Sequence, residues 1–167
     1  MSLELREVVD ADLPIFFEQQ LDPEANWMAA FTGKDPADRA AFERHWERIR
    51  KDPAIIIRTI VAGGQVAGHV SSYVEEGEPE VTYWLGRSFW GRGVASRSLR
   101  LFLDHVNHER PMRARVAKDN VASLTVLRKC GFEIVGEDRG YANARTAETE
   151  EFVLRLEAAL HLDGITL

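Results

Sequence analysis

The segment from 81 to 107 constrains the fold most, because it joins two different periodicities through a pair of glycines. Residues 81–85 (VTYWL) are typical of a strand, and from 94 to 107 apolar residues recur at helical spacing. Between them stands WGRG, with Gly91 and Gly93 on either side of an arginine. Glycine at such a junction lets the backbone turn sharply and approach a ligand closely. The segment predicts a helix that starts at a glycine turn directly after a strand.

The rest of the chain extends this pattern to a mixed sheet flanked by helices, an α+β fold. Asp10 is expected to cap the first helix, Asp35 and Pro36 to start the second, and the segment 21–36 to be an irregular connection that lines a pocket. Three strands in an antiparallel meander precede the strand–helix units. We expect strands over 3–9, 55–61, 65–73, 81–85, 112–116, 132–135 and 151–156, and helices after Asp10 and over about 35–51, 94–107 and 121–129.

Composition limits the class of protein. A chain of 167 residues with 45% hydrophobic residues has the size of one domain, predicted over 1–167. Apolar runs stay far below the roughly 20 residues that a bilayer crossing needs, so no membrane span is expected. A net charge of −6 argues against a nucleic-acid binder. The single cysteine, Cys130, is interpreted as a small core residue and fits a reducing compartment, so we expect a cytoplasmic protein.

The glycine turn has the properties of an anion site. The first amides of a helix lack intrahelical partners, and the helix dipole adds roughly half a positive charge there. Gly91, Gly93 and the small Ala95 keep side chains away from these amides, while Arg87 and Arg92 add positive charge. The turn therefore predicts a cradle for a pyrophosphate, with a simple glycine-rich turn as the alternative. A P-loop and a Rossmann fingerprint are both excluded by the spacing.

Two motifs carry a family resemblance. The segments YWLGRSFWGRGVASRSL (83–99) and KDNVASLTVLRKCGF (118–132) resemble the GNAT superfamily of acetyl-CoA-dependent N-acetyltransferases, and in particular its ribosomal-protein N-terminal acetyltransferases. The resemblance implies a mostly antiparallel, twisted sheet of six to seven strands with about four helices. It also implies that the fourth and fifth strands are splayed apart. The motif positions are Trp90, Gly93 and Ala95 in the first segment, and Asn120, Ser123, Gly131 and Phe132 in the second.

The resemblance also implies the cofactor, acetyl-CoA, whose pyrophosphate would lie in the glycine cradle. Backbone amides near Leu85 would then supply the oxyanion donor. The histidines show no metal-ligand spacing, and no metal is expected. The residues expected to bind the cofactor are Leu85, Arg87, Trp90, Gly91, Arg92, Gly93, Val94, Ala95, Asn120 and Ser123.

The catalytic groups are less clearly marked. Glu80 occupies the place where many members of the family carry a catalytic glutamate, and its alternative is an ordinary turn residue in EEGEPE. Many members also use a tyrosine seven residues after the motif asparagine to protonate the thiolate, and here that position is Leu127. Ser123 is the expected substitute, with helix capping as its alternative role.

The acceptor side remains open at this stage. Candidate substrate-pocket residues are Trp27, Phe31, His69 and Tyr83, although an isolated strand histidine such as His69 is more often structural. Arg113 and Arg115 are interpreted as a solvated strand face. The resemblance implies that the acceptor is a primary amine, which attacks the thioester directly without an acyl-enzyme. This amine is either a protein N-terminal α-amine or a small-molecule amine of the aminoglycoside, polyamine or amino-acid kind. A CoA-binding module without catalysis is the alternative, and the chain is expected to be a monomer or a homodimer.

Overall fold

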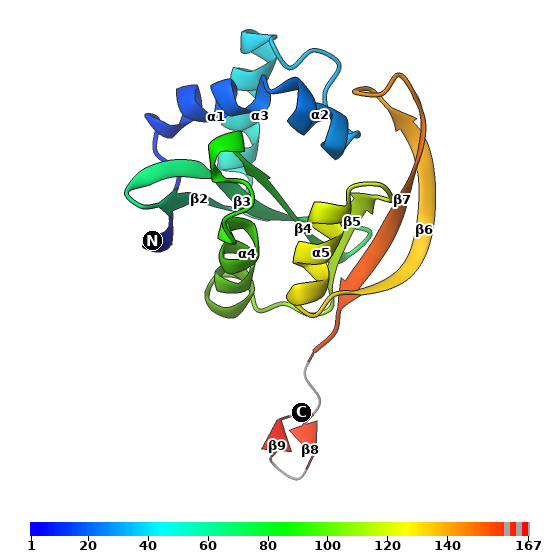
Figure 1. Ribbon diagram of the computed structural model, residues 1–167. Coiled ribbons are helices and arrows are strands. Elements are labelled where there is room, and N and C mark those ends of the chain that lie inside the picture. The colour runs from blue at the N-terminus through cyan, green and yellow to red at the C-terminus, as the bar shows by residue number, and fades with distance from the viewer. Residues whose placement is uncertain (159–160, 163–164, 167) are drawn as a thin grey trace.

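The computed structural model describes residues 1–158, 161–162 and 165–166. Of the predicted domain range 1–167, residues 159–160, 163–164 and 167 lie outside the described residues. Figure 1 shows the arrangement of the elements. The strands are β1 (Leu3–Arg6), β2 (Ile56–Ala62), β3 (Gln65–Glu75), β4 (Glu78–Leu85), β5 (Met112–Ala117), β6 (Glu133–Ala142), β7 (Ala147–Leu156), β8 (His161–Leu162) and β9 (Ile165–Thr166). The helices are α1 (Asp12–Gln20), α2 (Pro23–Ala29), α3 (Arg39–Lys51), α4 (Val94–His105) and α5 (Val121–Lys129), with a 3₁₀ turn over Arg87–Phe89.

Strands β1 to β7 form one seven-stranded sheet in the order β1-β2-β3-β4-β5-β7-β6. Neighbouring strands run antiparallel except β4 and β5, which are parallel. The predicted mixed, mostly antiparallel sheet is therefore confirmed. Within the described residues there are five α-helices instead of about four.

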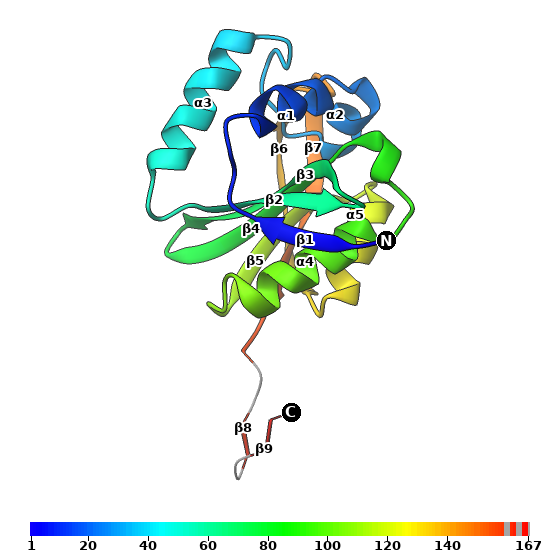
Figure 2. The ribbon, with the colours of Figure 1, turned by 90° about the vertical axis from the view of Figure 1, so that its left-hand side faces the viewer.

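The helices cover the two faces of this sheet. Figure 2 shows the sheet nearly edge-on, with α1, α2 and α3 on one side and α4 and α5 on the other. The larger core lies under α4 and α5, where Leu99 and Phe102 are fully buried against strand residues such as Val70 and Leu154. The helical spacing of the α4 side chains predicted this face. A second, aromatic core lies under α1 and α3 around Phe16, Phe17, Phe42, Trp46 and Ile57.

The start of α1 differs from the expectation that Asp10 caps it. The helix begins at Asp12, whose carboxylate accepts hydrogen bonds from the Val9 N–H (3.0 Å) and from Arg6 (2.7 and 2.9 Å). Asp10 instead forms an ion pair with Arg50 at 2.8 Å. The Asp10 prediction was wrong because, among the described residues, no side chain caps α1: its N-cap is Ala11, and the amides of Asp12 and Leu13 donate to the Val9 and Asp10 carbonyls at 2.9 and 3.2 Å.

The starts of α2 and α3 also correct the sequence prediction. The supposedly irregular segment contains α2, whose N-cap Asp22 precedes a proline at the first helical position. Helix α3 begins at Arg39, where the Asp38 carboxylate accepts from the Ala41 N–H at 3.0 Å. The predicted start at Asp35 and Pro36 was therefore three residues early, while the predicted end at Lys51 is confirmed.

The last two strands are much longer than predicted. Strands β6 and β7 pair from Glu133 with Arg155 to Ala142 with Ala147 and form the far edge of the sheet. Many side chains of β6 are exposed, so the clear apolar alternation that marks a half-buried strand is missing there. Figure 1 shows the tip of this hairpin reaching toward α2. Among the described residues, no helix is both long enough and apolar enough to cross a membrane.

Candidate functional site

A cleft opens between the parallel strands β4 and β5. Their only register pair is Glu80 with Arg113, near the start of each strand, so the two strands separate toward their carboxyl ends. The cleft has a volume of about 570 Å³ and is lined by residues 81–85 of β4, 114–117 of β5, the N-terminal turn of α4, most of α5 and part of α2. The predicted separation of the fourth and fifth strands is confirmed, and it makes room for a ligand of ordinary cofactor size.

The glycine turn forms one end of this cleft. Gly91 and Gly93 have φ values of 70° and 75°, in the left-handed region that favours glycine. Gly93 is the N-cap of α4, and no side chain of the described residues caps that helix end. Apart from the two chain neighbours, a Cβ built on either glycine meets no atom of the described residues within 4 Å, so both positions face open space. The first amides of α4 are therefore accessible from the cleft, as an anion site requires.

The residues around the turn hold it against β4. The indole N–H of Trp90 donates to the Leu85 carbonyl at 3.1 Å, and Val94 is fully buried beneath the first turn of α4. Arg92 donates to the Ser88 carbonyl at 3.3 Å. Arg87 forms ion pairs with Asp22 and Glu24 of the α2 start, and this contact lowers the pKa of Asp22. The charge of Arg87 is thus balanced by two carboxylates of the α2 start.

Asn120 joins α5 to α2 at the other side of the cleft. Its side-chain oxygen accepts from the Ser123 N–H at 3.3 Å and caps α5, and its amide nitrogen donates to the Met28 carbonyl at 3.3 Å. The sequence predicted Asn120 at the start of this helix but gave no signal for its contact with Met28. The two contacts place the N-terminal turn of α5 directly on the cleft.

Two hydroxyl groups meet inside the cleft. The Tyr83 hydroxyl, from β4, donates to Ser123 Oγ of α5 at 3.1 Å. Burial raises the pKa of Tyr83, which keeps its hydroxyl protonated at neutral pH. Leu127, one turn further along α5, also lines the cleft and is buried. The cleft therefore contains a phenol, that of Tyr83, which comes from strand β4. The position on α5 where the family resemblance expects a tyrosine holds the aliphatic Leu127.

Glu80 lies where β4 and β5 are still paired, before the two strands separate. One carboxylate oxygen accepts from the Tyr73 hydroxyl, and the other, Oε1, is buried without a hydrogen-bond partner in the described residues. Arg115 Nε lies 3.5 Å from Oε1. Burial and the bond to Glu80 raise the pKa of Tyr73. Sequence reasoning missed Tyr73, although the β3–β4 hairpin places it directly opposite Glu80.

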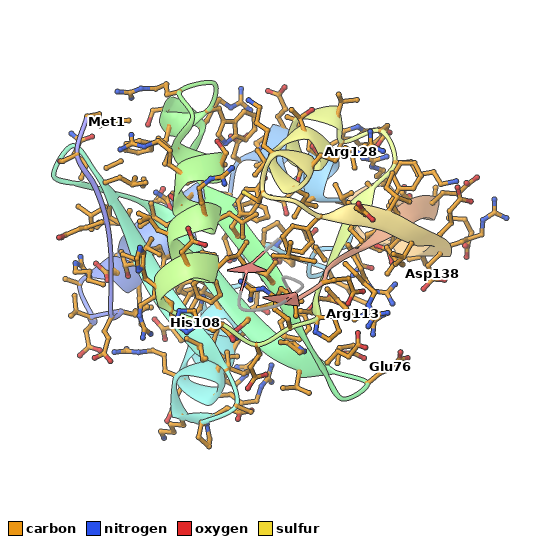
Figure 3. The ribbon with its side chains drawn as sticks, turned by 90° about the horizontal axis from the view of Figure 1, so that it is seen from below. Met1, Glu76, His108, Arg113, Arg128 and Asp138 are labelled. Atoms are coloured by element: carbon orange, nitrogen blue, oxygen red, sulfur yellow. The ribbon has the colours of Figure 1, made fainter. Side chains whose placement is uncertain are left out.

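Arg113 and Arg115 do not form the solvated strand face that their alternation suggested. Arg113 is 9% exposed and forms ion pairs with Glu76 (3.3 Å) and Glu78 (3.8 Å), and Figure 3 shows it near the hairpin that ends at Glu76. Arg115 contacts Glu80, Asp138 and Glu151. The prediction was wrong because β5 is a central strand, so both of its faces are covered and its arginines need acidic partners.

The candidate substrate residues do not all gather in one place. Tyr83 lines the cleft, whereas His69 lies under α1 and α3 with its ring 4.7 Å from Phe16 and 4.9 Å from Trp46. Burial, with the nearby charge of His45, lowers the pKa of His69 to about 4. Trp27 and Phe31 are exposed near the β6–β7 tip, outside the cleft lining. Cys130 is buried, as expected of a core residue.

The β6–β7 turn is fastened to the chain that follows α2, which the sequence did not predict. The Ala144 N–H donates to the Ala30 carbonyl at 3.2 Å, and the Asn143 side chain donates to the Thr32 carbonyl at 2.8 Å. Arg145 donates to the Trp27 carbonyl at 2.9 Å and lies over the Trp27 ring at 5.0 Å. These contacts join the turn to α2 and the segment that follows it. The acceptors of the Asn143 and Ala144 bonds are backbone carbonyls, which no side-chain pattern in the sequence indicates.

Comparison with known proteins decides the family. Residues 2–133 match the model of the acetyltransferase (GNAT) domain. The chain belongs to this family. Over 75 residues it is 33% identical to the uncharacterized N-acetyltransferase p20 of Bacillus licheniformis, a match that covers only 42% of each chain. Within the described residues, no group of three or more histidine, cysteine or acidic side chains is arranged to hold a metal ion.

Solved structures of the family share the whole fold. RimJ of Mycobacterium smegmatis, in complex with CoA-disulfide, has a TM-score of 0.80 at 21% identity, over 93% of this chain and 82% of that one. RimL, a ribosomal L7/L12 α-N-protein acetyltransferase in complex with coenzyme A, has a TM-score of 0.75 at 22% identity, over 90% and 92%. The spermidine N-acetyltransferase of Vibrio cholerae, in complex with CoA and spermine, has a TM-score of 0.76 at 16% identity, over 92% and 95%.

Proposed function

We propose that this chain transfers the acetyl group of acetyl-CoA directly to a primary amine, without an acyl-enzyme intermediate. The observation that carries the proposal is the cleft between β4 and β5, which ends at the uncapped N-terminus of α4. The open, left-handed glycines there leave room for a pyrophosphate against the helix amides, so the residues present fit CoA. Acetyl-CoA would supply an activated thioester. The structural neighbours of this chain, RimJ, RimL and the spermidine enzyme, were solved with CoA, which supports this choice of cofactor.

The residues of the cleft divide the work of holding this cofactor. The amides that follow Gly91 and Gly93 would bind the pyrophosphate, with Arg92 at the rim. The backbone near Leu85, where the strands have separated, would bind the pantetheine arm and donate to the oxyanion. Trp90, Val94 and Ala95 shape the turn, and Asn120 sets the first turn of α5 that presents Ser123. Arg87 acts through its ion pairs with α2 and steadies the turn.

Glu80 is the proposed base for the acceptor amine. Its Oε1 is a buried acceptor without a hydrogen-bond partner in the described part of the chain, so it can accept from a water next to the amine. Arg115, whose Nε lies 3.5 Å from the same oxygen, holds the carboxylate in place. An acceptor amine that is already partly neutral at pH 7 needs the least help from such a base. An α-amine has a pKa of about 7.7–8.0, against about 10.4 for a lysine side chain.

The acceptor that we propose is therefore the α-amine of a peptide or protein. The ribosomal-protein acetyltransferases RimJ and RimL among the structural neighbours support this choice. A small-molecule amine is the second candidate, supported by the spermidine enzyme with its bound spermine. The single cysteine, which is buried, fits a cytoplasmic enzyme.

The test is an acceptor panel with acetyl-CoA, read by thiol release and by the mass of the acceptor. It contains short peptides with a free α-amine, the same peptides blocked at the α-amine but carrying lysine, and spermidine. We expect kcat/KM at neutral pH to be at least about tenfold higher for the free α-amine peptides than for the blocked ones, because far more of the α-amine is neutral. A preference for spermidine would contradict the α-amine assignment. CoA binding without acetylation of any acceptor would identify a non-catalytic module.

A further inference from the structure

The contact between Tyr83 and Ser123 places a phenol where the helix lacks one. Ser123 and Leu127 lie one turn apart on α5, and both line the cleft. Leu127 holds the position at which the family resemblance expects a tyrosine. Tyr83 reaches the same region from the facing strand β4, with its hydroxyl 3.1 Å from Ser123 Oγ. Figure 3 views the molecule from the side on which α4 and α5 cover the sheet.

This contact determines what the serine hydroxyl can do. A serine hydroxyl has one proton and two lone pairs, and a phenol is the more acidic of the two groups. Tyr83 is therefore the donor, and one lone pair of Ser123 Oγ is occupied. The cap from Asn120 is made to the Ser123 backbone N–H and leaves the hydroxyl untouched. In the described residues Ser123 Oγ donates to no protein group, so its proton is available to the cleft.

We propose that Tyr83 is a positioning residue for thiol release: by donating to Ser123 Oγ, it fixes the Ser123 hydroxyl as a donor toward the departing sulfur. This inference rests on the proposed acetyl transfer. As the amine nitrogen bonds to the acetyl carbon and the C–S bond breaks, the bonding pair goes to sulfur. Ser123 stabilises that charge through its O–H, and water returns to the sulfur the proton that the amine lost. Tyr83 stays protonated throughout, which agrees with its raised pKa.

The first test needs no acceptor. The thiol of bound CoA is titrated by the ultraviolet absorbance of its thiolate, in the wild type and in Tyr83→Phe. A donor directed at sulfur favours the thiolate, so the thiol pKa in the wild-type complex should lie below that of free CoA. Tyr83→Phe should raise it at least halfway back toward the free value. Identical titrations in the two proteins would overturn the inference, because a merely structural Tyr83 would not affect the thiol.

The second test is a double-mutant cycle on kcat with the best acceptor. Tyr83→Phe should lower kcat by about tenfold and leave the KM for acetyl-CoA unchanged, because only part of one charge-directed hydrogen bond is lost. Tyr83→Phe added to Ser123→Ala should cause no further loss, since both changes remove the same donor. Independent, multiplying losses would overturn the inference, as would an unchanged kcat in Tyr83→Phe.

The matched control is Tyr141→Phe, which removes a phenol hydroxyl from a side chain that is 60% exposed and lies outside the cleft lining. It should keep the wild-type kcat and thiol titration. Thermal unfolding of each variant confirms that it is folded. A wild-type protein that acetylates no amine would refute the proposed function, and the thiol titration would still decide the role of Tyr83.

Discussion

Gly93→Val tests the cradle, and two separate effects can be worked out from the structure. The first is backbone strain, because Gly93 has a φ of 75° and a β-branched residue resists this region. The strain should lower the free energy of unfolding by about 1–3 kcal/mol. It is present with and without cofactor, so it cancels from the binding equilibrium.

The second effect is on affinity. The added side chain enters space that is empty of protein atoms within 4 Å of its Cβ, at the edge of the cleft where the pyrophosphate is proposed to lie. Loss of one charge-assisted hydrogen bond to an amide costs about 1.5–3 kcal/mol. The dissociation constant for acetyl-CoA should therefore rise by at least about tenfold, since each 1.4 kcal/mol is about tenfold.

Titration calorimetry with acetyl-CoA measures the second effect, and thermal unfolding measures the first. The matched control is Gly64→Val, because Gly64 has a φ of 78° and nothing within 4 Å of its Cβ but lies in the β2–β3 turn, away from the cleft. It should lose similar stability and keep wild-type affinity. A folded Gly93→Val protein with unchanged affinity would refute the cradle assignment.

Three further predictions follow from the described contacts. Glu80→Gln should lower kcat with little change in cofactor affinity, and the loss should shrink as the pH rises through the amine pKa, because free amine accumulates; a loss independent of pH in the rate profile would indicate a structural role. Gly68→Ala should lower the free energy of unfolding by about 3 kcal/mol in urea titrations, because its Cβ would lie 1.9 Å from the Trp84 carbonyl oxygen. Gly136→Ala is the control, because, apart from its chain neighbours, a Cβ at Gly136 meets no atom of the described residues within 4 Å. Its free energy of unfolding should stay within about 0.5 kcal/mol of wild type. Equal losses in the two variants would contradict the packing argument. His69→Gln should flatten the pH dependence of stability between about pH 4 and 6.5. Burial lowers the pKa of His69 in the folded state from 6.5 to about 4, so the free energy of unfolding falls as the pH drops through this range. If urea titrations give the same change of the free energy of unfolding with pH in both proteins, this role is excluded.

Much of the site was predictable because its signals are local. The glycine turn and the strand–helix order follow from neighbouring residues, and the separation of the fourth and fifth strands follows from the family resemblance. Asn120 was expected as a motif residue, whereas its role as the cap of α5 came from the structure. The contacts of Glu80 with Tyr73 and Arg115 could not be predicted from neighbouring residues. Whether Arg115 faces water or a buried carboxylate depends on which strands flank β5, and β7 comes some thirty residues later in the chain.

The acceptor side was the least predictable part. Helix α2 carries the same Asp-Pro start signal as the one assigned at Asp35, yet its seven residues make only about two turns, too few to show a helical period. The contacts of Asn143 and Ala144 end on backbone carbonyls, which every residue possesses. Such contacts leave no trace in side-chain chemistry, so they could be found only in the folded structure.

The most direct test of the account is a mass balance after incubation with acetyl-CoA and a peptide that has a free α-amine. The masses of peptide and protein and the amount of released thiol are measured together. The account predicts one acetyl group on the peptide α-amine for each CoA thiol released, and an unmodified protein. Thiol release with the acetyl group on the protein, at Cys130 or elsewhere, or with no acetylated acceptor, would contradict direct transfer from the cofactor to an amine.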